Sequence, residues 1–342
     1  MTSILILTAL FTLLLMRVPV AFALGGLGLA LLLLGGFSPL MAPQSMLGTV
    51  DNFVLLAVPL FLLMSNVLLK GGVGHDLFAA VQAWIGHLPG GLAIATVISC
   101  GIFAAISGSS VATAATIGTV AIPEMSQRGY PRPFVLGLLA AGGTLGILIP
   151  PSIPMIVFGF ITEESVIKLF LAGIGPGLLL MGLFIGFSMI YAWASPACQA
   201  SPKANWRERR DTGLRALPAL ALAALIIWGI YWGVFTPTEA AAIGFTASLV
   251  ITGLVLRTLT WKGLKEAITQ SMITTVTILL IIALPNTLAP AMISMIVTVV
   301  IIDCVMASFR PFQVSVRNTR PVITSDAVKP IAAASVGVNT PQ

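Results

Sequence analysis

The sequence predicts an all-α, polytopic membrane protein that contains a re-entrant helical hairpin and a broken helix. Of its 342 residues, 58% are hydrophobic and only 8% are charged, whereas a soluble domain carries roughly a quarter charged residues. Apolar runs recur along the chain, and each with its flanks approaches the ~20 residues that a helix needs to cross a bilayer. Basic residues lie between these runs, where they orient membrane helices. The runs include 27–34, 54–69, 178–190 and 217–231.

Other classes of function find little support in the sequence. The three cysteines, Cys100, Cys198 and Cys304, lie far apart and match neither a disulfide framework nor a metal-ligand spacing. No nucleophile elbow or phosphate loop is present, so we expect no enzyme, no ATP-driven pump and no cofactor. The net charge of +6 comes from short loops rather than from a basic patch interleaved with aromatic residues, so we expect the lipid bilayer and no nucleic acid as a partner.

The first helices are predicted from hydropathy and charge together. The apolar stretch 4–16 has no basic region before it and no cleavage pattern after it, so we interpret it as a retained helix rather than a signal peptide. If the N-terminus is outside, Arg17 falls in a tight inner turn and a span from residue 18 returns outward. The span from residue 53 then ends inside at Lys70.

The segment 91–122 is predicted to be the re-entrant hairpin. The chain is inside at Lys70 and again at Arg128 and Arg132, so this segment crosses the membrane an even number of times. A single full span here would invert every later loop. It would place the most basic loop, 203–215, on the wrong side.

The later spans follow from the same test. We expect a span from residue 134 to lead outside near residue 162, and a span from residue 173 to return inside. A span from residue 216 then leads outside to residue 236, and the next returns inside to residue 257. Only Lys168 then lies outside among the basic residues before 266. The inner ones are Arg17, Lys70, Arg128, Arg132, Lys203, Arg207, Arg209, Arg210, Arg215, Arg257, Lys262 and Lys265.

Two amphipathic segments with a tryptophan, 74–87 and 260–270, allow two interpretations. They are either interfacial helices in the plane of the headgroups or simple loop helices. A third local pattern is less ambiguous. Thr236, Pro237 and Glu239 form the sequence of a capping box, which we favour over a coupling role for Glu239.

Two stretches are not expected to be regular helix although they lie at membrane depth, where backbone groups need protein or water as partners. The first, 107–119, crowds small residues and hydroxyl groups at the hairpin tip. The second, 142–154, contains Pro150, Pro151 and Pro154 in the middle of the span from 134 to 160. Each of these prolines lacks an N–H group and clashes with the preceding turn.

A hairpin tip beside an unwound helix provides carbonyl and hydroxyl oxygens for a dehydrated alkali cation such as Na⁺. Helix N-termini at the same place favour an anionic group of a substrate. The alternative is that the small residues only permit close helix packing and that the prolines only kink one helix. The candidate substrate- and ion-binding residues are Ser107, Gly108, Ser109, Ser110, Thr113, Gly143, Thr144, Gly146, Ile149, Pro150, Pro151 and Ser152.

Several stretches resemble the large membrane subunit of tripartite ATP-independent periplasmic (TRAP) transporters, of the DctM type. They are 18–25, 58–61, 107–113, 123–130, 146–152 and 233–241. The resemblance covers residue 1 to about residue 283. It implies Na⁺-coupled import of small organic anions, such as dicarboxylates, across the bacterial inner membrane by an elevator movement. It also implies a periplasmic binding protein and a small membrane subunit as partners, and a first Na⁺ site at Ser107, Ser109, Gly146, Ile149 and Pro151.

The second half departs from this family pattern. The family is built from two inverted repeats, and we find no second hairpin or second Pro-Pro run after residue 283. We therefore predict a permease domain at 1–283, a divergent apolar segment at 284–309 and a disordered tail at 310–342, as in a truncated or frameshifted product. Two alternatives stay open: a transport-inactive chain that only binds the small subunit, and a related carboxylate carrier that needs no binding protein.

Overall fold

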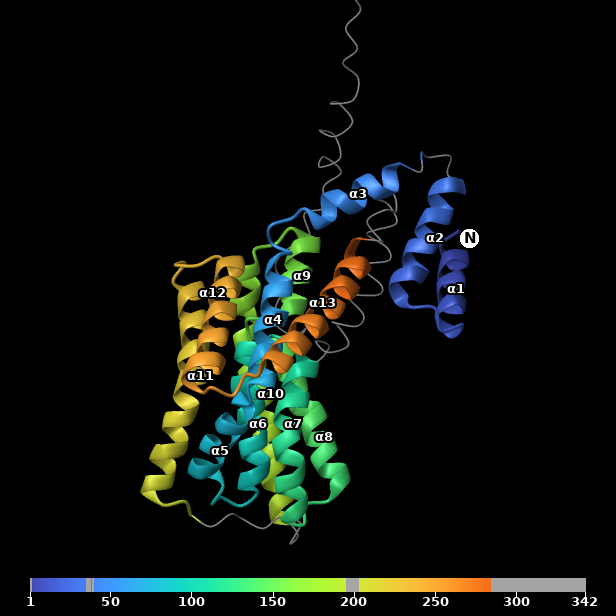
Figure 1. Cartoon of the computed structure of the whole chain (residues 1–342). Helices are drawn as coiled ribbons and strands as arrows, with labels where there is room; N and C mark the ends of the chain where they lie inside the picture. The colour runs from blue at the N-terminus through green and yellow to red at the C-terminus, as the bar shows by residue number, and fades with distance from the viewer. Residues whose placement is uncertain (1, 35–37, 39, 195–202, 284–342) are drawn as a thin grey trace, which may run out of the picture. The chain divides into compact units, whose positions relative to one another are not determined.

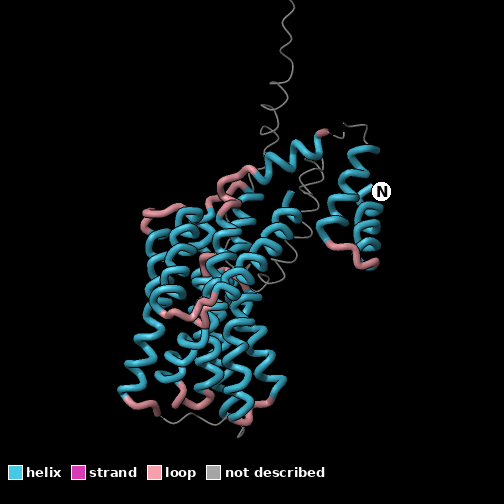
Figure 2. The backbone as a smooth tube through the Cα atoms, in the orientation of Figure 1, coloured by secondary structure: helices cyan, strands magenta, loops and turns pink. Residues whose placement is uncertain are grey.

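A computed structural model describes residues 2–34, 38, 40–194 and 203–283. These residues form helices and connecting loops without any strand (Figures 1 and 2), so the predicted all-α fold class is confirmed. The predicted segments 284–309 and 310–342 lie outside the described residues. The helices are α1 (Thr2–Leu15), α2 (Val20–Leu34), α3 (Met41–Val50), α4 (Ala57–Lys70), α5 (Val73–Ile85), α6 (Gly91–Ser107), α7 (Ser110–Gln127), α8 (Arg132–Leu148), α9 (Ile153–Thr162), α10 (Val166–Ala194), α11 (Trp206–Tyr231), α12 (Pro237–Val250), the π-helix η1 (Ile251–Val255) and α13 (Trp261–Ala283).

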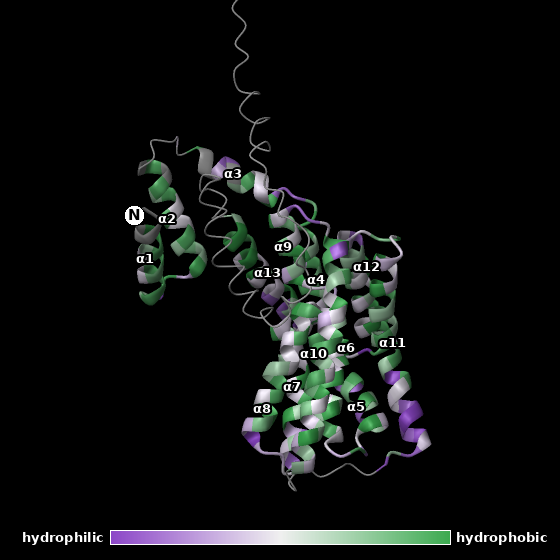
Figure 3. Ribbon diagram, turned by 180° about the vertical axis from the view of Figure 1, so that it is seen from behind, coloured by the Kyte–Doolittle hydropathy of each residue, from purple (hydrophilic) through white to green (hydrophobic). Residues whose placement is uncertain are grey.

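Four described helices are each long and apolar enough to cross a membrane: α10, α11, α12 continued by η1, and α13. Two further pairs pass the same test as bent spans, α4 with α5 at 68° and α8 with α9 at 41°. In Figure 3 the ribbons of these helices are coloured mostly for apolar residues, and polar residues gather at helix ends such as the start of α11. The chain is therefore a polytopic helical membrane protein.

Helix α6 occupies the centre of the core. All of its residues except Ile98 and Ile102 are buried, and it packs against α5, α7, α8, α10 and α11. A helix that is apolar on all sides is stable only inside a protein or a membrane. Glycine allows the closest approach, because a Cβ atom at Gly142 of α8 would lie 2.9 Å from the Sγ atom of Cys100.

The predicted hairpin consists of α6 and α7, which pack against each other. Their far ends meet where the hydroxyl group of Thr96 contacts the sulfur of Met125 at 3.5 Å. Their near ends meet where Ser107 and Thr113 are 2.9 Å apart. The two helices are therefore antiparallel and joined by a two-residue turn at the predicted tip.

Two of the basic segments predicted on one side meet at one end of the described part. The start of α8 contacts the end of α10 through Phe134 and Tyr191, whose stacked rings are 4.1 Å apart. The end of α5 contacts the start of α11 through Trp84 and Trp206. The loops around residues 128–132 and 203–205 thus lie at the end of the helices opposite to the hairpin tip, as the charge argument requires.

Three sequence predictions need refinement. Segment 260–270 is not a separate interfacial helix, because α13 continues without a break from Trp261 to Ala283. The basic segment 203–215 is mostly helical, since Asn205 caps α11 by accepting a hydrogen bond from the Trp206 amide at 2.7 Å. Helix α5 buries its apolar face, including Leu77, against other helices of the protein.

The capping box at the start of α12 is confirmed. The backbone amide of Thr236 donates to a carboxylate oxygen of Glu239 at 2.8 Å, and the amide of Glu239 donates to the Thr236 hydroxyl at 3.3 Å. Both groups are orphan donors at a helix start, so this reciprocal pair stabilises the first turn. It gives Glu239 a structural role.

Candidate functional site

The hairpin tip is built by a glycine and a serine. Helix α6 ends at Ser107, and Gly108 adopts a left-handed conformation with a φ of 60° while its amide donates to the carbonyl of Ala104. Glycine adopts this conformation without the steric penalty of a Cβ atom. Ser109 then caps α7 by accepting from the Ala112 amide at 3.4 Å, which is a favoured role for serine.

Oxygen atoms gather just behind this tip. The hydroxyl groups of Ser107 and Thr113 are 2.9 Å apart, and that of Thr113 donates to the carbonyl of Ser109 at 2.8 Å. Ser107 and Thr113 have no exposed surface. Three oxygens of the hairpin are thus held together in a buried position.

The second part of the site is the break between α8 and α9. Pro150 and Pro151, joined by a cis peptide bond, have no N–H groups to donate to the carbonyls of Gly146 and Ile147, four residues earlier. The hydroxyl of Ser152 replaces one missing donor by binding the Ile147 carbonyl at 2.6 Å. The amide of Ile149 makes the last regular helical bond of α8, to the Leu145 carbonyl at 2.8 Å. The carbonyl of Gly146 has therefore lost its helical donor.

The tip and the break touch each other. The amide of Ile153 donates to the carbonyl of Gly108 at 3.1 Å. A Cβ atom at Gly146 would lie 2.8 Å from the Ser109 oxygen, and one at Gly108 would lie 2.7 Å from the Pro151 oxygen. Because real Cβ contacts are not this short, both positions require glycine for the backbones to meet. The meeting of Gly108 and Ser109 with residues 146–153 is called the junction below.

Most of the predicted site residues come together at the junction. Ser107, Gly108, Ser109, Thr113, Gly146, Pro150, Pro151 and Ser152 lie there. Gly143 lies one turn away, where a Cβ atom would be 3.1 Å from the Ser110 carbonyl. The side chain of Ile149 faces Gly177 of α10. Thr144 is exposed, and its hydroxyl bonds to its own helix at Ala141.

A cavity of about 600 Å³ opens beside the junction. Its walls combine the hairpin tip, the start of α9, and helices α4 and α13, and its volume falls within the usual range for a small-molecule site. Polar side chains in the wall that the sequence reasoning missed are Ser65, Asn66, Gln270 and Thr274. A signal existed in the sequence, because Ser65 and Asn66 interrupt an otherwise apolar run, where polar residues are costly.

Two features of this wall bear on binding. The side-chain amide of Asn66 donates to the Ser271 hydroxyl at 2.8 Å, which links α4 to α13. The hydroxyl of Ser65 is buried and has no hydrogen-bond partner among the described residues. A buried polar group without a partner is destabilising unless a ligand or water supplies one.

Within the described ranges, no three His, Cys, Asp or Glu side chains gather where they could hold a metal ion. An ion at the junction would instead contact neutral carbonyl and hydroxyl oxygens. This donor set suits a hard monovalent cation.

Comparison with known proteins identifies the family of this chain. Residues 7–313 match the family described as the tripartite ATP-independent periplasmic transporter, DctM component. The chain belongs to this family. The family resemblance predicted from the sequence is confirmed, and a family of transporter permeases agrees with the prediction that the chain is not an enzyme.

Curated relatives among the TRAP large permeases are similar to most of the chain. A C4-dicarboxylate TRAP transporter large permease of Pseudomonas aeruginosa is 43% identical over 69% of this chain and 55% of its own length. An ectoine/5-hydroxyectoine large permease of Ruegeria pomeroyi is 39% identical over 70% and 56%. A sialic acid large permease of Vibrio cholerae is 35% identical over 77% and 62%. The chain spans about half the length of the first two.

Proposed function

We propose that this TRAP permease chain takes part in the import of small organic carboxylates together with Na⁺. The observation that carries the proposal is the junction, where hydroxyl and carbonyl oxygens from two interrupted helices meet beside a cavity. Backbone that is not helical is tolerated inside the membrane only where it is buried in protein or lines a water-filled cavity.

The Na⁺ ion is proposed to bind among the oxygens of Ser107, Ser109, Gly146, Ile149 and Pro151. Support comes from the carbonyl of Gly146, which the prolines leave without its helical donor, and from the close approach of Gly146 to Ser109 and of Gly108 to Pro151. Neutral oxygens at an unwound helix are typical of cation coupling sites in secondary transporters.

The substrate is proposed to occupy the adjacent cavity. The first residues of both α7 and α9 line it. Helix N-termini carry partial positive charge and free N–H groups, so two of them at one cavity favour an anionic group such as a carboxylate. Two relatives, a C4-dicarboxylate permease and a sialic acid permease, are named for acidic substrates, which agrees with this proposal.

Transport itself is proposed to use an elevator movement in the bacterial inner membrane. The cavity lies between the hairpin and broken helix on one side and α4 and α13 on the other, so sliding of the first group along the second would carry a bound solute. We further propose a periplasmic binding protein and a small membrane subunit as partners, and a periplasmic N-terminus on the basis of the placement of basic residues.

Reconstitution of the permease with these partners in proteoliposomes tests the proposal. We expect uptake of a C4-dicarboxylate or a sialic acid to require an inward Na⁺ gradient and to fall to background when K⁺ replaces Na⁺. Equal uptake in both salts would contradict Na⁺ coupling. Co-purification with the small subunit and no uptake in either salt would favour a chain that binds its partner without transporting.

A further inference from the structure

A basic and aromatic cluster lies at the start of α11, at the end of the helices opposite to the junction. The guanidinium carbon of Arg209 lies 5.5 Å from the centre of the Trp84 ring of α5. The rings of Trp84 and Trp206 are 6.1 Å apart in an edge-to-face arrangement. We call Trp84, Trp206 and Arg209 the α5–α11 cluster.

The charge of Arg209 lacks an anionic partner in the described part of the chain. Its Nε atom is buried and has no hydrogen-bond acceptor there. The ion pair that does form nearby joins Arg210 and Asp211, at 3.5 Å. A buried donor without an acceptor is costly, and a cation–π contact leaves its N–H groups unsatisfied.

The surrounding charge favours an external anion. Segment 203–215 holds five basic residues and two acidic ones, which leaves a net charge of +3. The basic residues are Lys203, Arg207, Arg209, Arg210 and Arg215, and the acidic ones are Glu208 and Asp211. An anion at Arg209 would therefore also be attracted by its neighbours.

Exposed apolar surface continues from the cluster along the span. Trp84 and Trp206 are 50% and 68% exposed, and Leu217 and Leu220 of α11, on the same face of the helix as Trp206 and Arg209, are 55% and 37% exposed. Tryptophan at the end of a membrane helix lies at the depth of the lipid headgroups. These two leucines, about three and four turns beyond Trp206, lie at the depth of the acyl chains.

We propose that the α5–α11 cluster binds an anionic phospholipid. The guanidinium of Arg209 contacts the headgroup phosphate, which matches its planar set of donors, and the acyl chains run along Leu217 and Leu220. A lipid fits better than a soluble phosphate compound because the apolar strip adjoins the charged group. Basic pockets between membrane helices bind anionic headgroups in this way.

Native mass spectrometry of the purified full chain, released from nanodiscs, tests the proposal. The discs contain phosphatidylcholine with or without phosphatidylglycerol, and the readout is the number of each lipid retained. We expect selective retention of phosphatidylglycerol, reduced roughly fivefold or more by Arg209→Ala. The matched control is Arg207→Ala, which removes one equal charge from the same helix and should reduce retention less than twofold.

Three further arms complete the experiment. Trp84→Leu keeps an apolar side chain but removes the ring under the guanidinium, and we expect it to weaken retention. If Arg209→Ala does not fold, Arg209→Lys keeps the charge without the planar donors and should still weaken retention. Inorganic phosphate, added at constant ionic strength, should not displace the lipid.

Three results would overturn the proposal. Equal losses in Arg207→Ala and in the tested Arg209 variant would mean diffuse attraction by the whole basic segment. Equal retention of both lipids would exclude selectivity for an anionic headgroup. Complete displacement by inorganic phosphate would assign the cluster to a soluble phosphate compound.

Discussion

The two bent helix pairs of this permease differ in what happens to their backbone groups. The pair α4–α5 bends by 68° at Gly71, and the pair α8–α9 bends by 41° at the prolines. At the glycine elbow the amide of Gly71 donates to Val67 at 2.8 Å, and its carbonyl accepts from the Thr258 hydroxyl at 2.6 Å. At the proline break the carbonyl of Gly146 has lost its helical donor.

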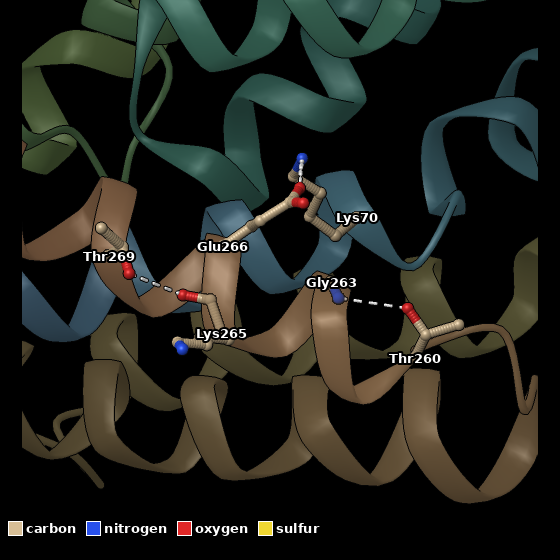
Figure 4. A network of polar contacts seen from close by, with 6 residues as sticks. All are labelled: Lys70, Thr260, Gly263, Lys265, Glu266 and Thr269. Carbon is tan, nitrogen blue, oxygen red and sulfur yellow. Dashed lines mark hydrogen bonds and ion pairs between the residues drawn. The ribbon is translucent and has the colours of Figure 1, made fainter.

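An ion pair also joins the elbow to its neighbour. Figure 4 shows Lys70 of α4 reaching Glu266 of α13, with 2.6 Å between the Lys70 nitrogen and the carboxylate oxygen. The pair with the larger bend, α4–α5, thus keeps hydrogen-bond partners for the backbone groups of Gly71, whereas the pair α8–α9 loses one at Gly146. A bend alone does not indicate a site in a membrane protein; unpaired backbone oxygen beside a cavity does.

The largest effect is expected from Gly146→Ala. The new Cβ atom would lie 2.8 Å from the Ser109 carbonyl, so the tip and the break must separate, and overpacking of this kind costs about 1–3 kcal/mol. We expect Na⁺-dependent uptake to fall by roughly fivefold to 100-fold, since 1.4 kcal/mol is tenfold in affinity. Gly137→Ala on the same helix is the control, because nothing lies within 4 Å of its Cβ atom. Equal uptake by both variants would contradict a site at the junction.

A second pair of variants separates backbone strain from contact. Gly108 and Gly72 are both left-handed, with φ of 60° and 72°, but only at Gly108 would a Cβ atom meet another group, the Pro151 carbonyl at 2.7 Å. Alanine should cost about 1–2 kcal/mol at Gly72 and about 1–3 kcal/mol more at Gly108. Denaturation of the two purified variants measures the difference. Equal unfolding free energies of the two variants would show that Gly108 is not in close contact with the Pro151 carbonyl.

Ser152→Ala is expected to have an intermediate effect. It removes the hydroxyl that bonds the Ile147 carbonyl at 2.6 Å in a fully buried position, and an unsatisfied buried acceptor costs about 1–3 kcal/mol. Thr162→Ala removes a similar bond, to the Phe158 carbonyl at 2.8 Å, at an exposed position. We expect this control to change the unfolding free energy by less than about 0.5 kcal/mol. A comparable loss in both variants would argue against a buried carbonyl at the break that depends on the Ser152 hydroxyl.

The smallest effect is expected at the glycine elbow. Lys70→Gln removes an ion pair whose side chains are 39% and 47% exposed, and exposed ion pairs contribute little because water and salt screen them. Na⁺-dependent uptake should remain near the wild-type level. Loss of Na⁺ dependence in this variant would mean that the elbow, rather than the proline break, carries the coupling.

Features set by local chemistry were predictable from the sequence. Three prolines in five positions end a helix wherever they occur, and Thr236 with Glu239 forms a capping box from four consecutive residues. The hairpin followed from charge placement, with its tip at Gly108 and Ser109. The proline and capping signals act over one or two turns, and the charge signal depends only on the order of loops along the chain, so no knowledge of the packing was needed.

Features set by packing were not predictable. The cavity wall depends on Asn66 and Ser271, which are 205 residues apart in the sequence, and no local pattern brings α4 against α13. The apolar face of α5 has the same composition whether it meets lipid or protein. Thr144 has the residue type expected at an ion site, but its position on α8 turns it away from the junction.

The most direct test of the account is a Na⁺ titration of thermal unfolding of the purified chain. A ligand that binds only the folded state stabilises it by RT ln(1 + [L]/Kd). The account predicts that the Tm of the wild type rises with NaCl but not with KCl at equal ionic strength, and that Gly146→Ala abolishes this difference. An equal rise in both salts, or a Na⁺ response unchanged in Gly146→Ala, would contradict a Na⁺ site where the hairpin tip meets the proline break.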